Sequence, residues 1–127
     1  MYRRPDLPLT SLPLKSRRVR TRFRAKPAGA HVVVSELAIE EIGIAGLEAA
    51  FSDRLGEVDS FPGHLGLQVW RDNRKPGRYL MVTWWETEDD FRQYMQSDSH
   101  RCSHARIPSE PARPKAVRVS RFSLVTE

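Results

Sequence analysis

Cysteine is almost absent from the sequence, since Cys102 is the only one among 127 residues. A single thiol excludes an intrachain disulfide, and an unpaired cysteine is more typical of a cytoplasmic protein than of a secreted one. No apolar run approaches the roughly 20 residues that cross a bilayer, and no signal-peptide core follows Arg3 and Arg4. We therefore expect a cytoplasmic protein with one hydrophobic core and no membrane segment.

Several motifs of enzyme chemistry are also missing. The sequence has no glycine-rich phosphate loop, no Cys-x-x-Cys pair and no serine in a recognisable nucleophile setting. These absences argue against a nicotinamide-binding or flavin-binding domain and against a serine hydrolase.

Acidic residues are scarce at one end of the chain. Residues 1–28 contain nine Lys or Arg and a single acid, Asp6, for a net charge of +8. Residues 29–127 carry a net charge of −3, so the overall charge of +5 belongs to the N-terminal part alone. With four prolines and so little apolar area, residues 1–28 are predicted to be a disordered basic arm, followed by one folded domain over residues 29–127.

The arm combines two kinds of side chain, and we weigh two roles for it. Docking to an acidic partner would use its arginines and its leucines, which the prolines hold extended; the plain alternative is a solubilising tail. The arginines are Arg17, Arg18, Arg20, Arg22 and Arg24, and the leucines are Leu7, Leu9, Leu12 and Leu14.

Apolar spacing predicts the first half of the domain. His31 to Leu37 begins with β-branched residues and predicts a strand. From Glu40 the apolar period becomes that of a helix of about five turns, which Gly43 and Gly46 allow to start late. Its expected buried stripe is Ile44, Leu47, Phe51, Leu55 and Val58.

The second half predicts a hairpin, a broken helix and a last strand. Strands are expected over residues 65–69 and 78–86 around a polar loop, with His64 exposed in the turn before them. Thr87 is expected to cap a helix that is interrupted at Ser97-Asp98 and continues to Arg106. The last strand, residues 115–125, changes its apolar phase between Val119 and Phe122, which predicts either a bulge there or a turn from one sheet surface to another.

The predicted order β-α-β-β-α-β is that of a ferredoxin-like α+β sheet with both helices on one face. The other face would carry either the odd-numbered or the even-numbered side chains of residues 79–85. A domain of this length offers no third layer to cover it, so we expect a homodimer with its sheets face to face.

Several segments resemble the antibiotic biosynthesis monooxygenase family. They are Phe61-Pro62-Gly63-His64-Leu65-Gly66, then Tyr79-Leu80-Met81-Val82-Thr83-Trp84-Trp85-Glu86, then Phe91, Tyr94, Ser97, His100 and His104. The family has a PGF-x-G turn before its second strand, a strand that ends in V-T-x-W-E, and a helix with F-x-x-W and S-x-x-H-x-x-x-H. The resemblance covers residues 30 to 125 and implies a dimeric α+β barrel.

The resemblance implies oxygen chemistry of one of two kinds. Some members oxidise aromatic polyketides or quinols with O2 and no cofactor, and others bind heme and open its ring. The heme-opening members use an axial histidine, which matches His104, and a tryptophan where this chain has Tyr94. They also use a strand asparagine, where this chain has Ser35 or, with a two-residue shift, Leu37. Two of the three positions therefore differ from the heme-opening pattern.

Each candidate residue also has a plainer interpretation. His104 is either an axial ligand or base, or a histidine satisfied at a helix end. His100 and His104 have the i, i+4 spacing of metal ligands, but no third ligand is evident, so no metal site is predicted. Tyr94 and Trp85 either line an aromatic pocket or belong to the core, and Ser35 is a hydrogen-bond donor to substrate, to O2 or to water.

Three functions remain open from the sequence. The first is a cofactor-free monooxygenase that acts on a small aromatic or quinol substrate, with His104 as base, Tyr94 and Ser35 as donors and Trp85 as a wall. The second is a heme-binding protein with His104 as ligand. The third is a non-catalytic dimeric adaptor that is recruited through its basic arm.

Overall fold

A four-stranded antiparallel sheet forms one layer of the molecule in the computed structural model, which describes residues 25–54 and 58–127. The strands are β1 (His31–Ala38), β2 (His64–Arg71), β3 (Arg78–Trp85) and β4 (Lys115–Ser123). They lie in the order β2-β3-β1-β4, with β3 and β1 as the two central strands. This order confirms the ferredoxin-like α+β prediction.

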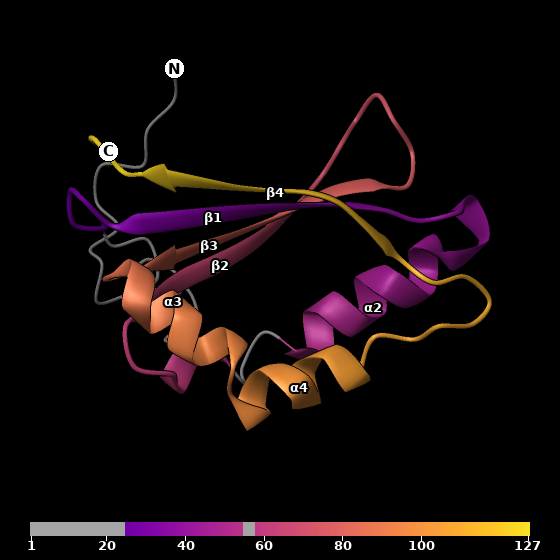
Figure 1. Ribbon diagram of the computed structural model, residues 1–127. Helices are drawn as coiled ribbons and strands as arrows, with labels where there is room; N and C mark the ends of the chain where they lie inside the picture. The colour runs from indigo at the N-terminus through magenta and orange to yellow at the C-terminus, as the bar shows by residue number, and fades with distance from the viewer. Residues whose placement is uncertain (1–24, 55–57) are drawn as a thin grey trace, which may run out of the picture.

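The helices form the second layer. They are α2 (Ile44–Arg54), α3 (Glu88–Met95) and α4 (Asp98–Ala105), with short 3-10 turns η2 (Glu41–Gly43) and η3 (Val58–Ser60). All three α-helices lie on the same side of the sheet (Figure 1). None of the described residues forms a helix on the other face of the sheet, in agreement with the prediction that both helices share one face. In the part of the chain that the structure describes, no helix is both long and apolar enough to cross a membrane.

The first helix is shorter than the five turns predicted from the sequence. It begins at Ile44, after the glycine-weakened η2, but its last residue is Arg54. Val58 lies in η3 and packs beside Trp85, not with the side chains of α2. The apolar residues of the predicted stripe therefore pack in two different clusters. Their regular spacing gave no sign that the helix ends before Val58. Leu55, also placed on this stripe, lies outside the described residues.

The broken second helix is confirmed. The Thr87 hydroxyl accepts a hydrogen bond of 3.0 Å from the Asp90 backbone N–H and caps α3. Ser97 ends that helix and caps the next one, because its hydroxyl accepts a hydrogen bond from the His100 N–H. The new cap turns the chain, so that α4 leaves in a different direction from α3 (Figure 1).

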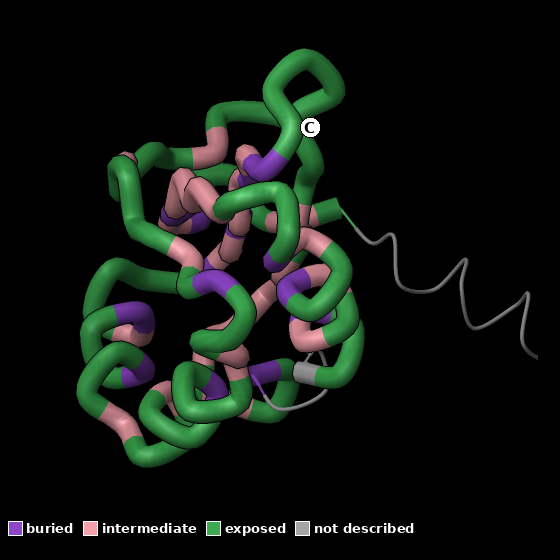
Figure 2. Tube along the Cα trace, turned by 90° about the vertical axis from the view of Figure 1, so that its right-hand side faces the viewer, coloured by how far each residue is buried: buried purple, intermediate pink, exposed green. Residues whose placement is uncertain are grey.

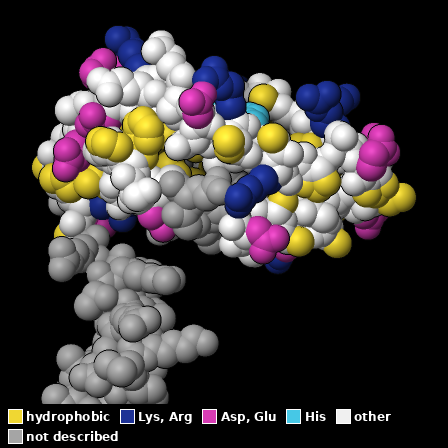
Figure 3. All heavy atoms as spheres, turned by 90° about the horizontal axis from the view of Figure 1, so that it is seen from below, with side chains coloured by type: hydrophobic (Ala, Val, Ile, Leu, Met, Phe, Trp, Pro, Cys, Tyr) yellow, Lys and Arg dark blue, Asp and Glu magenta, His cyan; other side chains and the backbone are white. Residues whose placement is uncertain are grey.

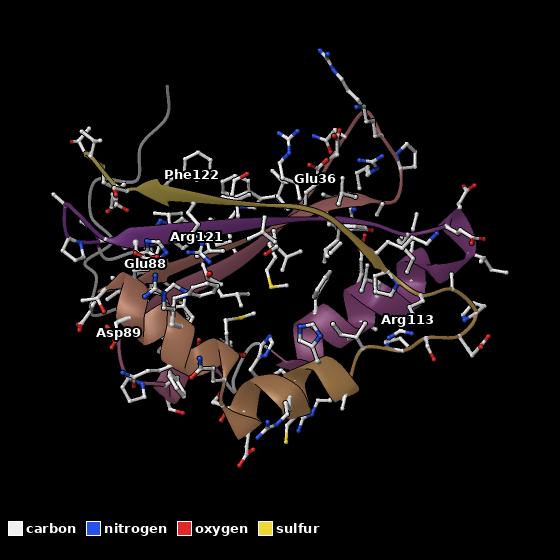
Figure 4. The ribbon with its side chains drawn as sticks, viewed as in Figure 1. Glu36, Glu88, Asp89, Arg113, Arg121 and Phe122 are labelled. Atoms are coloured by element: carbon white, nitrogen blue, oxygen red, sulfur yellow. The ribbon has the colours of Figure 1, made fainter. Side chains whose placement is uncertain are left out.

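Strand β4 has its irregularity at Val117, two residues before the predicted segment. The pairing with β1 shifts between Glu36 and Leu37, which leaves Val117 as the extra residue on β4. Between Val119 and Phe122 the pairing is regular. Arg121 points toward α3 and Phe122 points to the side without helices (Figure 4). The apolar phase changes because β4 presents apolar residues on both faces.

Two buried clusters lie between the sheet and the helices. The Trp85 cluster contains the buried residues Val33, Val58, Trp85, Phe91 and Tyr94. The Tyr79 cluster contains Leu47, Phe51 and Tyr79, with Leu37 and Val69 packed against it. Buried segments occur on both layers in the turned view of Figure 2, while exposed segments dominate the loops. The odd-numbered residues of β3 thus face the helices.

The opposite face of the sheet, called the open face below, carries a group of apolar side chains beside the charged Glu36 and Arg78. Val82 is buried there by its neighbours, Leu80 and Trp84 are half-buried, and Phe122 and Trp70 are 54% and 48% exposed. Figure 4 shows Glu36 on this same side of the sheet. Isolated exposed aromatics are common on monomers, but a continuous group of them typically marks an interface.

The two ends of the described chain meet at one edge of the sheet. The Gly29 N–H donates to the Leu124 carbonyl at 2.8 Å, and the Leu124 N–H donates to the Ala30 carbonyl at 2.9 Å. The Lys26 ammonium lies 4.6 Å from the centre of the Trp84 ring, a cation–π contact on the open face. Residues 1–24 of the predicted arm lie outside the described residues.

Candidate functional site

Trp85 lies at the centre of the helix-covered face. Its side chain is fully buried, and its ring contacts Tyr94 at a centroid distance of 5.2 Å, Phe91 at 5.9 Å and Phe61 at 6.3 Å. The indole N–H donates to the Thr83 hydroxyl at 3.0 Å, so its one polar atom is satisfied. In this structure Trp85 is a core residue that is enclosed by other aromatic rings.

Tyr94 connects this cluster to the histidines of α4. Its ring lies 5.2 Å from the His100 ring, and the His100 ring lies 4.5 Å from that of His104. The Tyr94 hydroxyl is buried and has no hydrogen-bond partner among the described residues. A buried hydroxyl without a partner costs roughly 1–3 kcal/mol, so it is a candidate to bind a ligand group.

His104 lies in the last turn of α4 and is exposed. The structure therefore brings three predicted site residues into one line of ring contacts, from Trp85 through Tyr94 and His100 to His104. This line runs from the buried centre of the molecule to its surface. Viewed from the helix side, that surface mixes basic, acidic and apolar side chains (Figure 3).

Ser35 lies apart from this line. It is in the middle of β1, where it pairs with Met81 of β3, and its side chain shares the helix-covered face with Val33 and Leu37. Met81 is four residues from Trp85 along β3, a separation of roughly 13 Å. Ser35 is half-buried and lies between the two clusters, closer to the Tyr79 cluster than the sequence suggested.

The turn before β2 places His64 against Trp85. Gly63 adopts a φ of +82°, and a Cβ at this position would lie 2.3 Å from the Asp90 carboxyl group. The Glu86 N–H donates to the Gly63 carbonyl at 2.8 Å, which ties the turn to the end of β3. Only glycine adopts this positive φ and approaches Asp90 this closely without strain.

The prediction that His64 is exposed is wrong. Its side chain is 2% exposed and its ring centroid lies 5.1 Å from that of Trp85, because His64 pairs directly with Trp85 across β2 and β3. Nε2 is buried without a hydrogen-bond partner among the described residues, and Nδ1 lies 3.9 Å from the Asp59 carboxylate. Burial lowers the pKa of His64, and the Asp59 charge opposes this by raising it.

A cavity of about 250 Å³ opens between α2 and the edge strand β2. One wall belongs to the Trp85 cluster through Leu67, and the other to the Tyr79 cluster, so the cavity marks the place where the two clusters meet. Its lining residues are Glu48, Phe51, Ser52, Leu67, Gln68, Val69, Arg71 and Tyr79.

A hydrogen-bonded group that the sequence analysis missed closes one end of this cavity. Glu48 accepts a hydrogen bond from the Tyr79 hydroxyl at 2.5 Å and two from the Arg71 guanidinium at 2.5 and 2.9 Å. The bonds from Arg71 and Tyr79 lower the pKa of Glu48, and burial and the carboxylate raise the pKa of Tyr79. The group is therefore a carboxylate beside a neutral phenol. Glu48 follows the core residue Leu47, and this was its only signal in the sequence.

The described residues suit heme better than a metal ion. In residues 25–54 and 58–127, no group of three His, Cys, Asp or Glu side chains is arranged to hold a metal ion. Heme needs one imidazole that reaches the iron. His104 offers such a ring at the exposed end of α4, beside His100, and thus fits the role of an axial ligand.

Comparison with known proteins identifies the sequence relatives of the chain. A family model described as antibiotic biosynthesis monooxygenase matches residues 30–106. The chain is 39% identical over 64 residues to a mycobilin-producing heme oxygenase of Mycobacterium tuberculosis, which is 49% of this chain and 61% of the relative. It is 35% identical over 52 residues to a staphylobilin-producing heme oxygenase of Staphylococcus epidermidis, 39% of this chain and 49% of the relative. The match thus spans only about half of each relative's length, or slightly more.

Two solved structures share this fold. The cofactor-independent oxygenase SnoaB of Streptomyces nogalater superposes with a TM-score of 0.65 at 16% identity, over 79% of this chain and 97% of that one. At this identity the likeness shows the fold alone. The heme-degrader MhuD of Mycobacterium tuberculosis, solved with two hemes in its active site, has a TM-score of 0.51 at 29% identity, over 74% and 94% of the two chains.

Proposed function

Because the chain belongs to the antibiotic biosynthesis monooxygenase family, we propose that it is an oxygenase that oxidises a small aromatic or quinol-type substrate with O2. In this proposal the reaction needs neither flavin nor nicotinamide. The substrate binds on the helix-covered face of the sheet, where the Trp85 cluster meets the cavity beside α2.

One observation carries this proposal, namely the buried Tyr94 hydroxyl without a partner. It lies among aromatic rings, so a flat apolar molecule would find stacking surfaces there and one polar group to bind. The cavity beside α2 is connected to the Trp85 cluster through Leu67, and its volume of about 250 Å³ is slightly below the usual range for drug-sized ligands, which favours a small substrate.

In this reaction the protein positions the substrate and accepts one proton from it. A histidine, His104 in the sequence prediction, takes the proton of a phenolic hydroxyl, and the phenolate formed is electron-rich enough to reduce O2. Tyr94 donates a hydrogen bond to the negative charge that develops, and Trp85 forms a wall. Ser35, predicted from the sequence as a second donor, lies opposite Met81, roughly 13 Å along the sheet from Trp85, and is too far away to share this role. One oxygen atom enters the substrate and the other leaves as water.

Anthrone is a suitable probe because its enol tautomer, anthrol, presents a phenolic hydroxyl and because its oxidation balances without a reductant. Its central CH2 loses two hydrogens and gains one oxygen atom from O2, and the remaining oxygen and hydrogens form water. We expect the protein to consume one O2 per anthraquinone formed and to release no H2O2. A rate no higher than that of buffer alone would refute the proposal for this substrate.

The variant Tyr94→Phe separates the hydroxyl from the ring. It keeps the aromatic packing and removes one donor, so kcat should fall by about 100-fold. Met95→Leu is the matched control, because Met95 follows directly in α3 but is 44% exposed. The control should keep its rate within about twofold. Equal rates for the two variants would exclude Tyr94 from the site.

Heme binding is the second candidate function, and the sequence relatives favour it. Two relatives with 35% and 39% identity are heme oxygenases, and His104 fits an axial ligand. Heme, when bound, supplies the iron that activates O2. In this role Tyr94 would pack beside the porphyrin and offer its hydroxyl to a polar group of the bound ligand.

Hemin titration distinguishes the two candidates. Heme binding predicts a sharp Soret band that His104→Ala removes and that weakens in acid, because a protonated imidazole cannot ligate iron. The matched control is His100→Ala, which leaves the proposed ligand in place. A spectrum that is unchanged in His104→Ala would remove this residue as the ligand.

We also propose a homodimer formed through the open face of the sheet. Trp70 and Phe122 are about half exposed there, next to the half-buried Leu80 and Trp84. A second copy would cover these side chains at once. Docking of the basic arm to an acidic partner remains a prediction from the sequence.

A further inference from the structure

His64 is a buried titratable residue that the proposed chemistry has not yet used. It is 2% exposed, and the tautomer with hydrogen on Nδ1 is the one that the Asp59 carboxylate favours. In that tautomer Nε2 carries a lone pair and accepts a hydrogen bond. This atom has no partner among the described residues.

A second orphaned polar atom, of opposite character, lies near the same tryptophan. The Tyr94 hydroxyl donates as well as accepts, and it too is buried without a partner in the described part of the chain. The rings of His64 and Tyr94 lie 5.1 and 5.2 Å from the ring of Trp85. A phenolic hydroxyl bound between these two side chains would satisfy both atoms, because it donates one hydrogen bond and accepts another.

His31 shows that burial alone does not single out His64. It pairs with Trp85 from the other side, and its Nε2 is also buried without a described partner. However, its ring contacts Phe91 at 5.9 Å, and it forms no ion pair with an acid among residues 25–54 and 58–127. Of these two histidines, only His64 has both a ring contact with Trp85 and a carboxylate, that of Asp59, near its Nδ1 atom.

Phe61 offers a route to these two atoms. Its ring is partly exposed, and it packs edge-on against Tyr94 at 5.1 Å and against Trp85 at 6.3 Å. A ligand ring that displaces Phe61 would therefore contact the same two aromatic surfaces. Such a displacement costs little if the entering ring restores the buried apolar area.

We propose that His64 and Tyr94 together bind the hydroxyl group of the aromatic substrate, and that His64 rather than His104 takes its proton. This inference rests on the proposed oxygenase function and names the base within it. The O–H bond of the substrate breaks, its proton moves to His64 Nε2, and the electron pair stays on the oxygen as phenolate. Asp59 stabilises the imidazolium that results and acts as a positioning residue.

Binding of a phenol that does not react tests the proposal independently of oxygen chemistry. The full chain, with histidines labelled with 15N, is titrated with 2-naphthol. We expect the Nε2 signal of His64 to shift, and Tyr94→Phe to weaken binding by about fivefold through loss of one hydrogen bond. No shift of the His64 signal at millimolar 2-naphthol would overturn the proposal.

Rates with anthrone then test the proton transfer. His64→Phe keeps an aromatic ring but no base, and His64→Gln keeps a polar group without basicity. Both should lower kcat by about 100-fold or more, while His64→Gln keeps KM within about threefold. The control His31→Phe should keep the wild-type rate. A loss in His104→Ala with no loss in His64→Gln would return the role of base to His104.

The pH profile identifies the base and tests Asp59. The rising limb of kcat/KM should disappear in His64→Gln, and in Asp59→Asn it should move to lower pH with its maximum retained, because the carboxylate raises the pKa of His64. A limb that is unchanged in His64→Gln would overturn the inference. If anthrone is not oxidised but 2-naphthol shifts His64, the oxygenase proposal fails for this substrate while the hydroxyl-binding site stands.

Discussion

Replacing Leu47 by alanine removes three carbon atoms from the centre of the Tyr79 cluster. Leu47 is 0% exposed and packs with Phe51 and Tyr79 beneath α2. At roughly 0.8 kcal/mol per buried carbon, the transfer contribution alone is about 2.4 kcal/mol. The cavity left behind adds to this, so we expect Leu47→Ala to lower the free energy of unfolding by about 3 kcal/mol, within the range of 2–5 kcal/mol for such changes.

Urea-induced unfolding, followed by tryptophan fluorescence, measures this loss. Ile42→Ala is the control, because Ile42 is also aliphatic and close in the chain but 68% exposed. It should change stability by less than about 0.5 kcal/mol. If Leu47→Ala cost less than about 1 kcal/mol, or no more than the control, the buried face assigned to α2 would be wrong.

Three further predictions concern charge and assembly. Burial lowers the pKa of His64 in the folded protein, so below pH 6.5 the unfolded chain binds a proton on this residue more readily than the folded chain does. The free energy of unfolding should therefore fall as the pH drops below 6.5, and His64→Phe should lack this fall in the same pH titration. The pKa of Glu48 is lowered mainly by its hydrogen bond from Arg71, so Glu48 stabilises the folded protein above pH 4.5 and this stabilisation should be lost as the pH falls below 4.5. In Glu48→Gln the free energy of unfolding should depend less on pH below 4.5. On the open face, Phe122→Asp should convert a dimer to monomer in analytical ultracentrifugation, whereas Val125→Asp, at an 83% exposed position, should not; a dimer that survives Phe122→Asp would disprove the proposed interface.

The strands and the broken helix could be predicted from the sequence because local signals mark them. Alternating residues specify β3, and Thr87 and Ser97 cap two successive helices where the sequence places them. The end of α2 could not be predicted, because Val58 continues the helical spacing while it packs in a different cluster. Periodicity reports that a residue is buried, not against which partner it is buried.

The candidate site was predicted only in part, for a related reason. Trp85, Tyr94 and His104 were identified by a motif, and the structure connects them through ring contacts. His64 was misjudged because a turn residue beside proline and glycine usually lies at the surface. Glu48 belongs to a group whose members are far apart in the sequence, so no local pattern could reveal it.

The backbone hydrogen bonds between Gly29, Ala30 and Leu124 bring the start and end of the folded domain within reach of one short linker. A circularly permuted chain could therefore join residue 127 to residue 25 and open the exposed loop between β2 and β3, at Asn73 and Arg74. In the natural sequence β1 and β4 are separated by most of the chain. In the permuted chain the new linker joins them, and they become the two strands of a local hairpin. At the same time β2 and β3 move to opposite ends of the permuted chain, so one local strand pair is exchanged for another and the folding rate should change little.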